Sequence, residues 1–186
     1  TPESLREKLA DPTMTEAHWR RFTCNLPTMD ENKEPYIDLQ DWDELADDEG
    51  ILEGASVCLG GDGSRTWDTT VIAWASVDDE VVTVDARVFS VRDTIPSHVL
   101  HRGGKIDFDD VEQFVIDRFD VFDVDEVAYD PRYLERSMEI AEDRLTDANV
   151  FAVEPSSKNM REALQAMFNL AAEGKLRHRG DPVIRA

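Results

Sequence analysis

Two aspartates of this sequence stand where an apolar stretch ends and the chain turns. Asp62 follows the apolar run 57–59 and lies among the glycines of 60–63, which let the backbone bend tightly and leave open space. Asp130 follows the apolar run 127–129 and precedes Pro131. A pair of carboxylates at strand ends is suited to binding hard cations such as Mg²⁺ or Mn²⁺, which can assist phosphodiester hydrolysis.

Each aspartate also has a purely structural interpretation. Asp62 is compatible with an ordinary Asp-Gly hairpin turn, and Asp130 with a helix N-cap before a proline. Asp68 is a weaker candidate: it could assist at the metals, or cap the start of the next strand, which is the interpretation we favour.

The elements that must position these residues are visible as hydrophobic patterns. β-branched and alternating stretches predict strands, and apolar residues three and four apart predict helices. The predicted strands are 55–61, 69–77, 81–91, 124–129 and 150–153. The predicted helices are 109–119, one opened by Pro131, and one capped at Ser156 or Ser157 with a buried face of Met160, Ala163, Leu164, Met167, Phe168 and Ala171.

This order of elements predicts an α/β fold. Three strands joined by tight turns, followed by strands alternating with helices, indicate a mixed sheet that is antiparallel first and parallel afterwards, with flanking helices. If the strands before Asp62 and Asp130 are neighbours, the two carboxylates meet at one edge, where ligands usually bind in such sheets. Residues 1–54 are expected to be a linker and surface connector, with Trp42 as its anchor.

The charge is strongly acidic but unevenly distributed. The chain has 41 acidic and 20 basic residues, a formal net charge of −21, which repels nucleic acid on average. Residues 156–186 carry six Lys or Arg against three acidic residues. No apolar run reaches membrane-spanning length, so we expect no membrane partner.

A basic loop and a basic tail are therefore the candidate contacts for DNA phosphates. The loop contributes Arg102 and Lys105; the tail contributes Lys175, Arg177, His178 and Arg179. Both are also compatible with solvated surface, and His178 is expected to be a DNA contact or a surface residue rather than a metal ligand, because no Cys or second His stands at ligand spacing.

Several of these segments, in this order, resemble a known family. They are Gly61–Ala73, Val88-Phe89, Val127–Pro131 and His178–Val183, and together they resemble the C-terminal nuclease domain of the large terminase subunit of tailed bacteriophages. The resemblance covers roughly residues 55–186, and the segment Trp19–Asn25 with the Trp42 connector resembles the link from that family's ATPase domain.

The resemblance implies an RNase H-like fold and two-metal endonucleolytic cutting of concatemeric double-stranded DNA during genome packaging. It implies Asp62 and Asp130 as metal ligands, Mg²⁺ or Mn²⁺ as cofactor, and a portal protein and a small terminase subunit as partners. The expected location is the host cytoplasm, at the capsid portal.

One departure from the family matters. The family takes its third metal carboxylate from a segment after the stretch that matches His178–Val183, so we expect the domain to continue past Ala186 and the metal site to be incomplete here. Asp181 is a possible substitute, but its Gly-Asp-Pro context is more typical of a turn. The alternative function is an inactive docking module that binds DNA, portal or a partner subunit.

Three other classes of protein fit the sequence less well. An actin-like or sugar-kinase ATPase would need a second phosphate-binding segment and about twice the length. A P-loop motor would need a Gly-x-x-x-x-Gly-Lys-Ser/Thr loop, which the sequence does not contain. An EF-hand at Asp62 fails, because Ala73 stands where the bidentate Glu belongs.

Overall fold

The computed structural model describes residues 37–64, 69–142 and 149–185. The chain divides into two compact units, residues 1–36 and residues 37–186, and only the second contains described residues. Asp68 and the segment Trp19–Asn25 lie outside the described residues.

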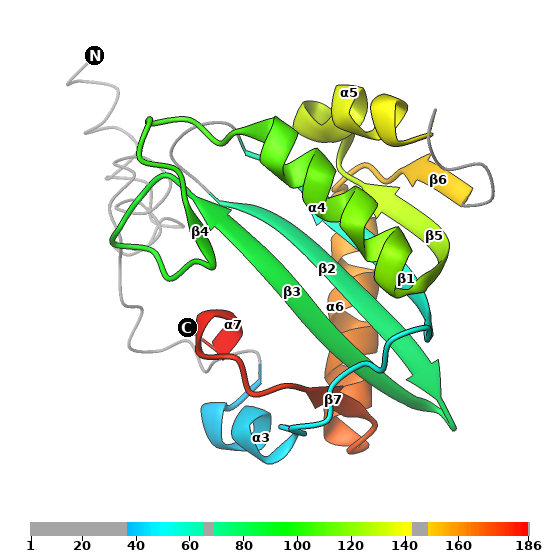
Figure 1. The fold of residues 1–186 in the computed structure, drawn as a ribbon. Coiled ribbons are helices and arrows are strands. Elements are labelled where there is room, and N and C mark those ends of the chain that lie inside the picture. The colour runs from blue at the N-terminus through cyan, green and yellow to red at the C-terminus, as the bar shows by residue number, and fades with distance from the viewer. Residues whose placement is uncertain (1–36, 65–68, 143–148, 186) are drawn as a thin grey trace, which may run out of the picture. The chain divides into compact units, whose positions relative to one another are not determined.

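A seven-stranded mixed sheet forms the centre of the second unit. Its order is β4-β3-β2-β1-β5-β6, and β7 pairs with the same edge of β3 as β4 does, but at the other end of β3 (Figure 1). The pairs β1–β2 and β2–β3 are antiparallel, whereas β1–β5, β5–β6, β3–β4 and β3–β7 are parallel. The predicted α/β fold class, antiparallel first and then parallel, is confirmed.

The predicted strands are all present within a residue or two of their expected ends. They are β1 Ser56–Asp62, β2 Thr70–Asp78, β3 Val81–Ser90, β5 Asp123–Tyr129 and β6 Asn149–Ala152. Two short strands, β4 Val99–Leu100 and β7 Leu176–His178, were not predicted. Neither has the length to show an alternating pattern, and both exist because the edge of β3 offers them backbone partners.

Helices lie on both faces of the sheet. The three predicted helices are α4 Phe108–Val121, α5 Pro131–Glu142 and α6 Ser157–Ala172, with the short α3 Leu39–Glu44 and α7 Pro182–Arg185 in addition. Helices α4 and α5 cover one face, and α6 crosses behind the opposite face (Figure 1). None of the described helices is long and apolar enough to cross a membrane.

The hydrophobic core lies between the sheet and the α4–α5 layer. Val57, Leu59, Ile72, Trp74 and Phe89 from the strands pack with Val111 and Val115 of α4 and Leu134 and Met138 of α5. Asp107 caps α4 by accepting a hydrogen bond from the Asp109 amide, which fixes the start of the helix. This start lies at the end of the sheet where β3 and β4 finish.

The expected burial of α6 is wrong. The helix forms where predicted, and Ser156 caps it, but Met160, Leu164 and Phe168 are 47%, 40% and 42% exposed. Periodicity alone predicts that a helix has an apolar face, whereas burial depends on how closely a second surface approaches that face.

The first and last described segments pack on each other. The Trp42 ring of α3 stacks on His178 of β7 with 4.0 Å between centroids, so Trp42 is an anchor, as predicted. Ala46 forms a parallel bridge with His178, and Arg185 of α7 binds Asp43 of α3 through two hydrogen bonds. Residues 37–47 are thus joined to the C-terminal segment.

Candidate functional site

Asp62 and Asp130 lie side by side at the ends of adjacent parallel strands. Strand β1 pairs with β5 in a register that sets Gly61 opposite Tyr129, and the Asp130 amide donates to the Gly61 carbonyl at 2.9 Å. The next residue on each strand is the aspartate. Asp62 is an exposed residue and Asp130 is a half-buried one, so both residues border solvent.

Close packing of α5 on β1 explains the glycine before Asp62. A Cβ at Gly61 would stand 2.8 Å from the Cδ1 of Leu134, a residue with 0% exposure. The missing side chain therefore lets the first turn of α5 approach the strand. Because α5 begins at Pro131, this contact also fixes where the chain leaves β5 and turns at Asp130.

The backbone around the two carboxylates is held by local hydrogen bonds. One oxygen of Asp130 accepts from the Arg132 amide at 3.0 Å, as a helix cap does, so the capping interpretation is correct for that oxygen. The fully buried Thr70 hydroxyl accepts from the Ser64 amide at 3.1 Å and donates to the Ser64 carbonyl at 2.8 Å. These bonds join Ser64, two residues after Asp62, to the first residue of β2.

The two carboxylates supply the hard oxygen donors that a divalent cation prefers. Within the described ranges, no group of three or more His, Cys, Asp or Glu side chains could hold a metal ion. The described part of the site thus fits a cation held by two protein carboxylates whose other positions are filled by water or a phosphate, an arrangement common for Mg²⁺.

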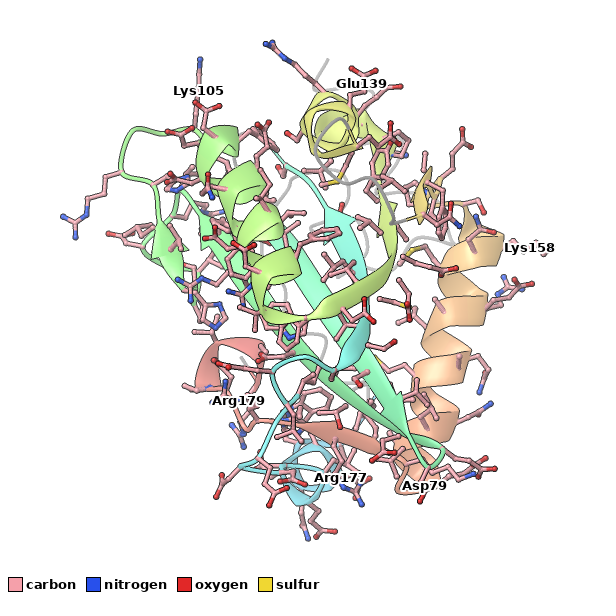
Figure 2. All side chains as sticks on the ribbon, turned by 45° about the vertical axis from the view of Figure 1, so that its right-hand side comes forward. Asp79, Lys105, Glu139, Lys158, Arg177 and Arg179 are labelled. Carbon is pink, nitrogen blue, oxygen red and sulfur yellow. The ribbon has the colours of Figure 1, made fainter. Side chains whose placement is uncertain are left out.

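The basic loop lies at the same end of the sheet as the aspartates. It follows β4, which pairs with the last residues of β3, and Arg102 and Lys105 are exposed. Figure 2 shows the Lys105 side chain pointing away from the fold. His101 anchors the loop: its Nδ1 accepts from the Asp107 amide at 2.8 Å, and its Nε2 lies 3.1 Å from the Asp110 carboxylate. Strands β4 and β1 are three spacings apart, or about 14 Å.

Comparison with known proteins bears directly on this arrangement. Residues 87–186 match the family model described as "Terminase large subunit, endonuclease domain". The chain belongs to this terminase family. A comparison with curated protein sequences found no match.

Solved structures of phage terminases share the fold. The large terminase of bacteriophage HK97 superposes with a TM-score of 0.67 at 20% identity, covering 82% of this chain and 35% of that protein. The large terminase nuclease of thermophilic phage G20c gives 0.53 at 11% identity, covering 73% of this chain and 66% of that one. The same nuclease with bound magnesium gives 0.52 at 13% identity, with the same coverage. The terminase chain thus has the RNase H-like fold and spans about a third of the HK97 protein.

The basic tail of this terminase domain lies at the opposite end of the sheet from the aspartates. On β7, His178 is paired with Val84 of β3. Val84 is paired with Ala75 of β2, which is paired in turn with Cys58 of β1. Asp62 is four residues further along β1, or about 13 Å. Figure 2 shows that the tail is also far from the basic loop, with Lys105 at the top and Arg177 and Arg179 in the lower part of the view.

Two of the tail cations already have partners in the protein. Lys175 binds Glu80 at 2.8 Å and Glu173 at 3.3 Å, and these hydrogen bonds raise the pKa of the Lys175 ammonium. Arg177 donates from Nη1 to the carbonyls of Gly174 and Leu176. These contacts oppose a transfer of either side chain to DNA.

His178 is not at the surface, so that expectation is wrong. It is 2% exposed, its Nε2 lies 2.8 Å from the Trp42 carbonyl, and its Nδ1 accepts from the Gly180 amide at 3.0 Å. Because the amide occupies Nδ1, Nε2 is the donor. A tryptophan in a polar connector and a histidine in a basic tail gave no local signal that they would pack together.

Asp181 is part of a turn, as its sequence context predicts. Its Oδ1 accepts from the Val183 amide at 2.7 Å, and its Oδ2 accepts from His98 Nε2 at 3.0 Å. His98 Nδ1 in turn accepts from the Val88 amide, at the edge of β3. Burial by itself would raise the pKa of Asp181, but the bonds from His98 and Val183 outweigh it and lower that pKa. The Asp181 carboxylate is thus held by its own partners beside β3, and strand β2 lies between β3 and β1, the strand that ends at Asp62.

Proposed function

We propose that residues 55–186 of this terminase chain are a metal-dependent endonuclease domain that cuts concatemeric double-stranded DNA by two-metal phosphodiester hydrolysis. The observation that carries the proposal is the pairing of Asp62 and Asp130 at the ends of adjacent parallel strands. Family membership supports the nuclease assignment. Residues 1–54 would connect this domain to a preceding ATPase region.

Asp62 and Asp130 would hold the metal ions, with Mg²⁺ or Mn²⁺ as the cofactor. The related G20c nuclease has been crystallised with magnesium. Divalent ions bound at such a site polarise the phosphate and lower the pKa of a water. The contribution of this chain is to fix the two carboxylates: Gly61 and Leu134 set the approach of α5, and the Arg132 amide orients Asp130. Asp68 keeps its weaker proposed role as a helper or strand cap.

The DNA would approach from the end of the sheet that carries the aspartates. Arg102 and Lys105 are the proposed phosphate contacts, because they are exposed cations at that end of the sheet. The distance of about 14 Å between strands β4 and β1 corresponds to the length of about four base pairs of DNA at 3.4 Å each. Among the tail residues, Arg179 remains a candidate, whereas Lys175 and Arg177 would first have to give up their present partners.

The wider role of this domain follows from the proposed nuclease activity. A portal protein and a small terminase subunit would be its partners in the complete packaging motor. Cutting would take place in the host cytoplasm, at the capsid portal.

Plasmid nicking in Mn²⁺ and in Mg²⁺ tests the proposal. We expect Asp62→Asn and Asp130→Asn each to abolish cleavage. The matched control is Asp123→Asn, an exposed aspartate at the opposite end of β5, which should leave cleavage unchanged. Equal activity of the parent and both site variants would refute the assignment.

A second candidate function is a docking module that binds DNA, portal or a partner subunit without cutting. The absence of a three-residue metal cluster from the described residues favours it. A parent chain that binds Mn²⁺ by calorimetry through Asp62 and Asp130, but never nicks DNA, would support this candidate.

A further inference from the structure

A cavity opens at the end of the sheet opposite the two aspartates. It has a volume of about 520 Å³ and lies between the loop 47–55, the end of β2 and the start of β3. Its lining includes Asp47, Glu49, Leu52, Val77, Asp78 and Asp79, which we call the hairpin pocket because the β2–β3 hairpin forms one wall. Figure 2 shows Asp79 at this end of the molecule.

The apolar part of the hairpin pocket is unusually open to solvent. Leu52 and Val77 are 70% and 69% exposed, more than any other large hydrophobic residue in the described part of the chain. Two aliphatic side chains exposed on the wall of one cavity form a site that a partner's apolar side chain could cover.

The polar part of the hairpin pocket is made of carboxylates that lack cationic partners. Within the described ranges, none of Asp47, Glu49, Asp78 and Asp79 forms an ion pair, although the neighbouring Glu80 is paired with Lys175. Arg177 also lines the cavity, but its Nη1 donates to two backbone carbonyls. Among the described lining residues, the four carboxylates outnumber the single cation, Arg177, so the pocket has a surplus of negative charge around its apolar wall.

We propose that the hairpin pocket binds a basic segment of a partner protein, in which Lys or Arg residues flank one aliphatic or aromatic side chain. The apolar side chain sits against Leu52 and Val77, and the cations pair with the surrounding carboxylates. A polyanion is excluded by the charge of the pocket. This inference goes beyond the proposed nuclease function, because the pocket is at the far end of the sheet and a partner here leaves Asp62 and Asp130 open to DNA.

The test is a peptide titration of the full 186-residue chain. The probe is a fluorescein-labelled peptide of alternating Lys and Arg with one central Leu, and a second peptide carries Ser in place of Leu. Fluorescence anisotropy gives the two Kd values, and amide chemical shifts locate the bound peptide. We expect the Leu peptide to bind more tightly and to shift the amides of the hairpin pocket.

Two variants that preserve the fold make the test specific. Asp78→Asn/Asp79→Asn removes two charges, and Asn tolerates the positive φ of 46° at Asp79. Val77→Thr keeps the β-branch and removes an apolar methyl. We expect the Asn pair to weaken the Leu peptide about three- to tenfold and Val77→Thr to reduce the difference between the peptides.

The matched control is Asp93→Asn/Asp120→Asn, which removes two exposed charges outside the pocket. It should leave the Kd within about twofold of the parent value, since distant exposed charges are screened by salt. Equal weakening by the control pair, equal binding of the two peptides, or shifts confined to other surfaces would overturn the proposal. None of these results bears on plasmid nicking, so the two proposals can fail separately.

Discussion

The role of His178 distinguishes a structural from a DNA-binding C-terminal tail. The structure buries its ring, with a stacking contact to Trp42 and one hydrogen bond at each nitrogen. We expect His178→Ala to lower the free energy of unfolding by about 3 kcal/mol, from about 1 kcal/mol for the aromatic pair and about 1 kcal/mol for each hydrogen bond. The affinity for DNA of the folded variant should not change.

Urea unfolding followed by tryptophan fluorescence measures this loss. With an m value of about 2 kcal/mol per molar urea, the midpoint should fall by about 1.5 M. His178→Phe is the matched variant: it keeps a ring against Trp42 and loses both hydrogen bonds, so its loss should be about 2 kcal/mol. DNA affinity is measured alongside by anisotropy at low salt, under conditions where all variants are folded.

A structural role and a DNA-binding role of His178 predict opposite results in these two assays. A midpoint within about 0.25 M of the parent for His178→Ala, together with a clear loss of DNA affinity, would refute the structural reasoning and restore the residue as a DNA contact.

Two further predictions concern the elements around the site. Leu134→Ala should lower the free energy of unfolding by about 2–5 kcal/mol, because the side chain is fully buried. It should also reduce any nicking activity by more than the loss of folded protein explains, since Leu134 sets the approach of α5 to Gly61. For Asp85, desolvation raises the pKa of the half-buried carboxyl. The folded state therefore binds this proton more tightly than the unfolded state does. At a pH above the folded pKa the carboxyl is ionised, and its burial then lowers the stability of the folded protein. Asp85→Asn should thus stabilise the protein at pH 7, and the gain should shrink as pH falls through that pKa and vanish below about 3.9. Thermal unfolding at pH 7 and at pH 4 checks the sign, and a larger gain at pH 4 would contradict it.

The sequence predicts the central sheet well because its strands carry their own signals. The β-branched run of β3 and the alternation in β2 predict strands without knowledge of their neighbours. The order of elements also predicts that the strands before Asp62 and Asp130 run parallel, since a strand that returns through a helix pairs parallel to an earlier one. The structure then shows that these two strands are neighbours.

Features that depend on distant partners are not predictable in this way. Strand β7 has three residues and forms because β3 offers it backbone partners, and His178 is buried because a segment 136 residues earlier in the chain supplies Trp42. The apolar stripe of α6 shows the opposite error: its periodicity predicts a buried face, but the described residues do not fully cover that face.

The outer edge of β3 is closed in sections by unrelated pieces of the chain. Strand β7 pairs with Val82–Val84, the His98 ring accepts from the Val88 amide, and β4 pairs with the last two residues of the strand. A ten-residue strand with β-branched side chains would otherwise offer its free amides and carbonyls to any other extended chain. The C-terminal segment therefore protects the domain against edge-to-edge aggregation, and it does so with backbone atoms, whatever its charged side chains bind.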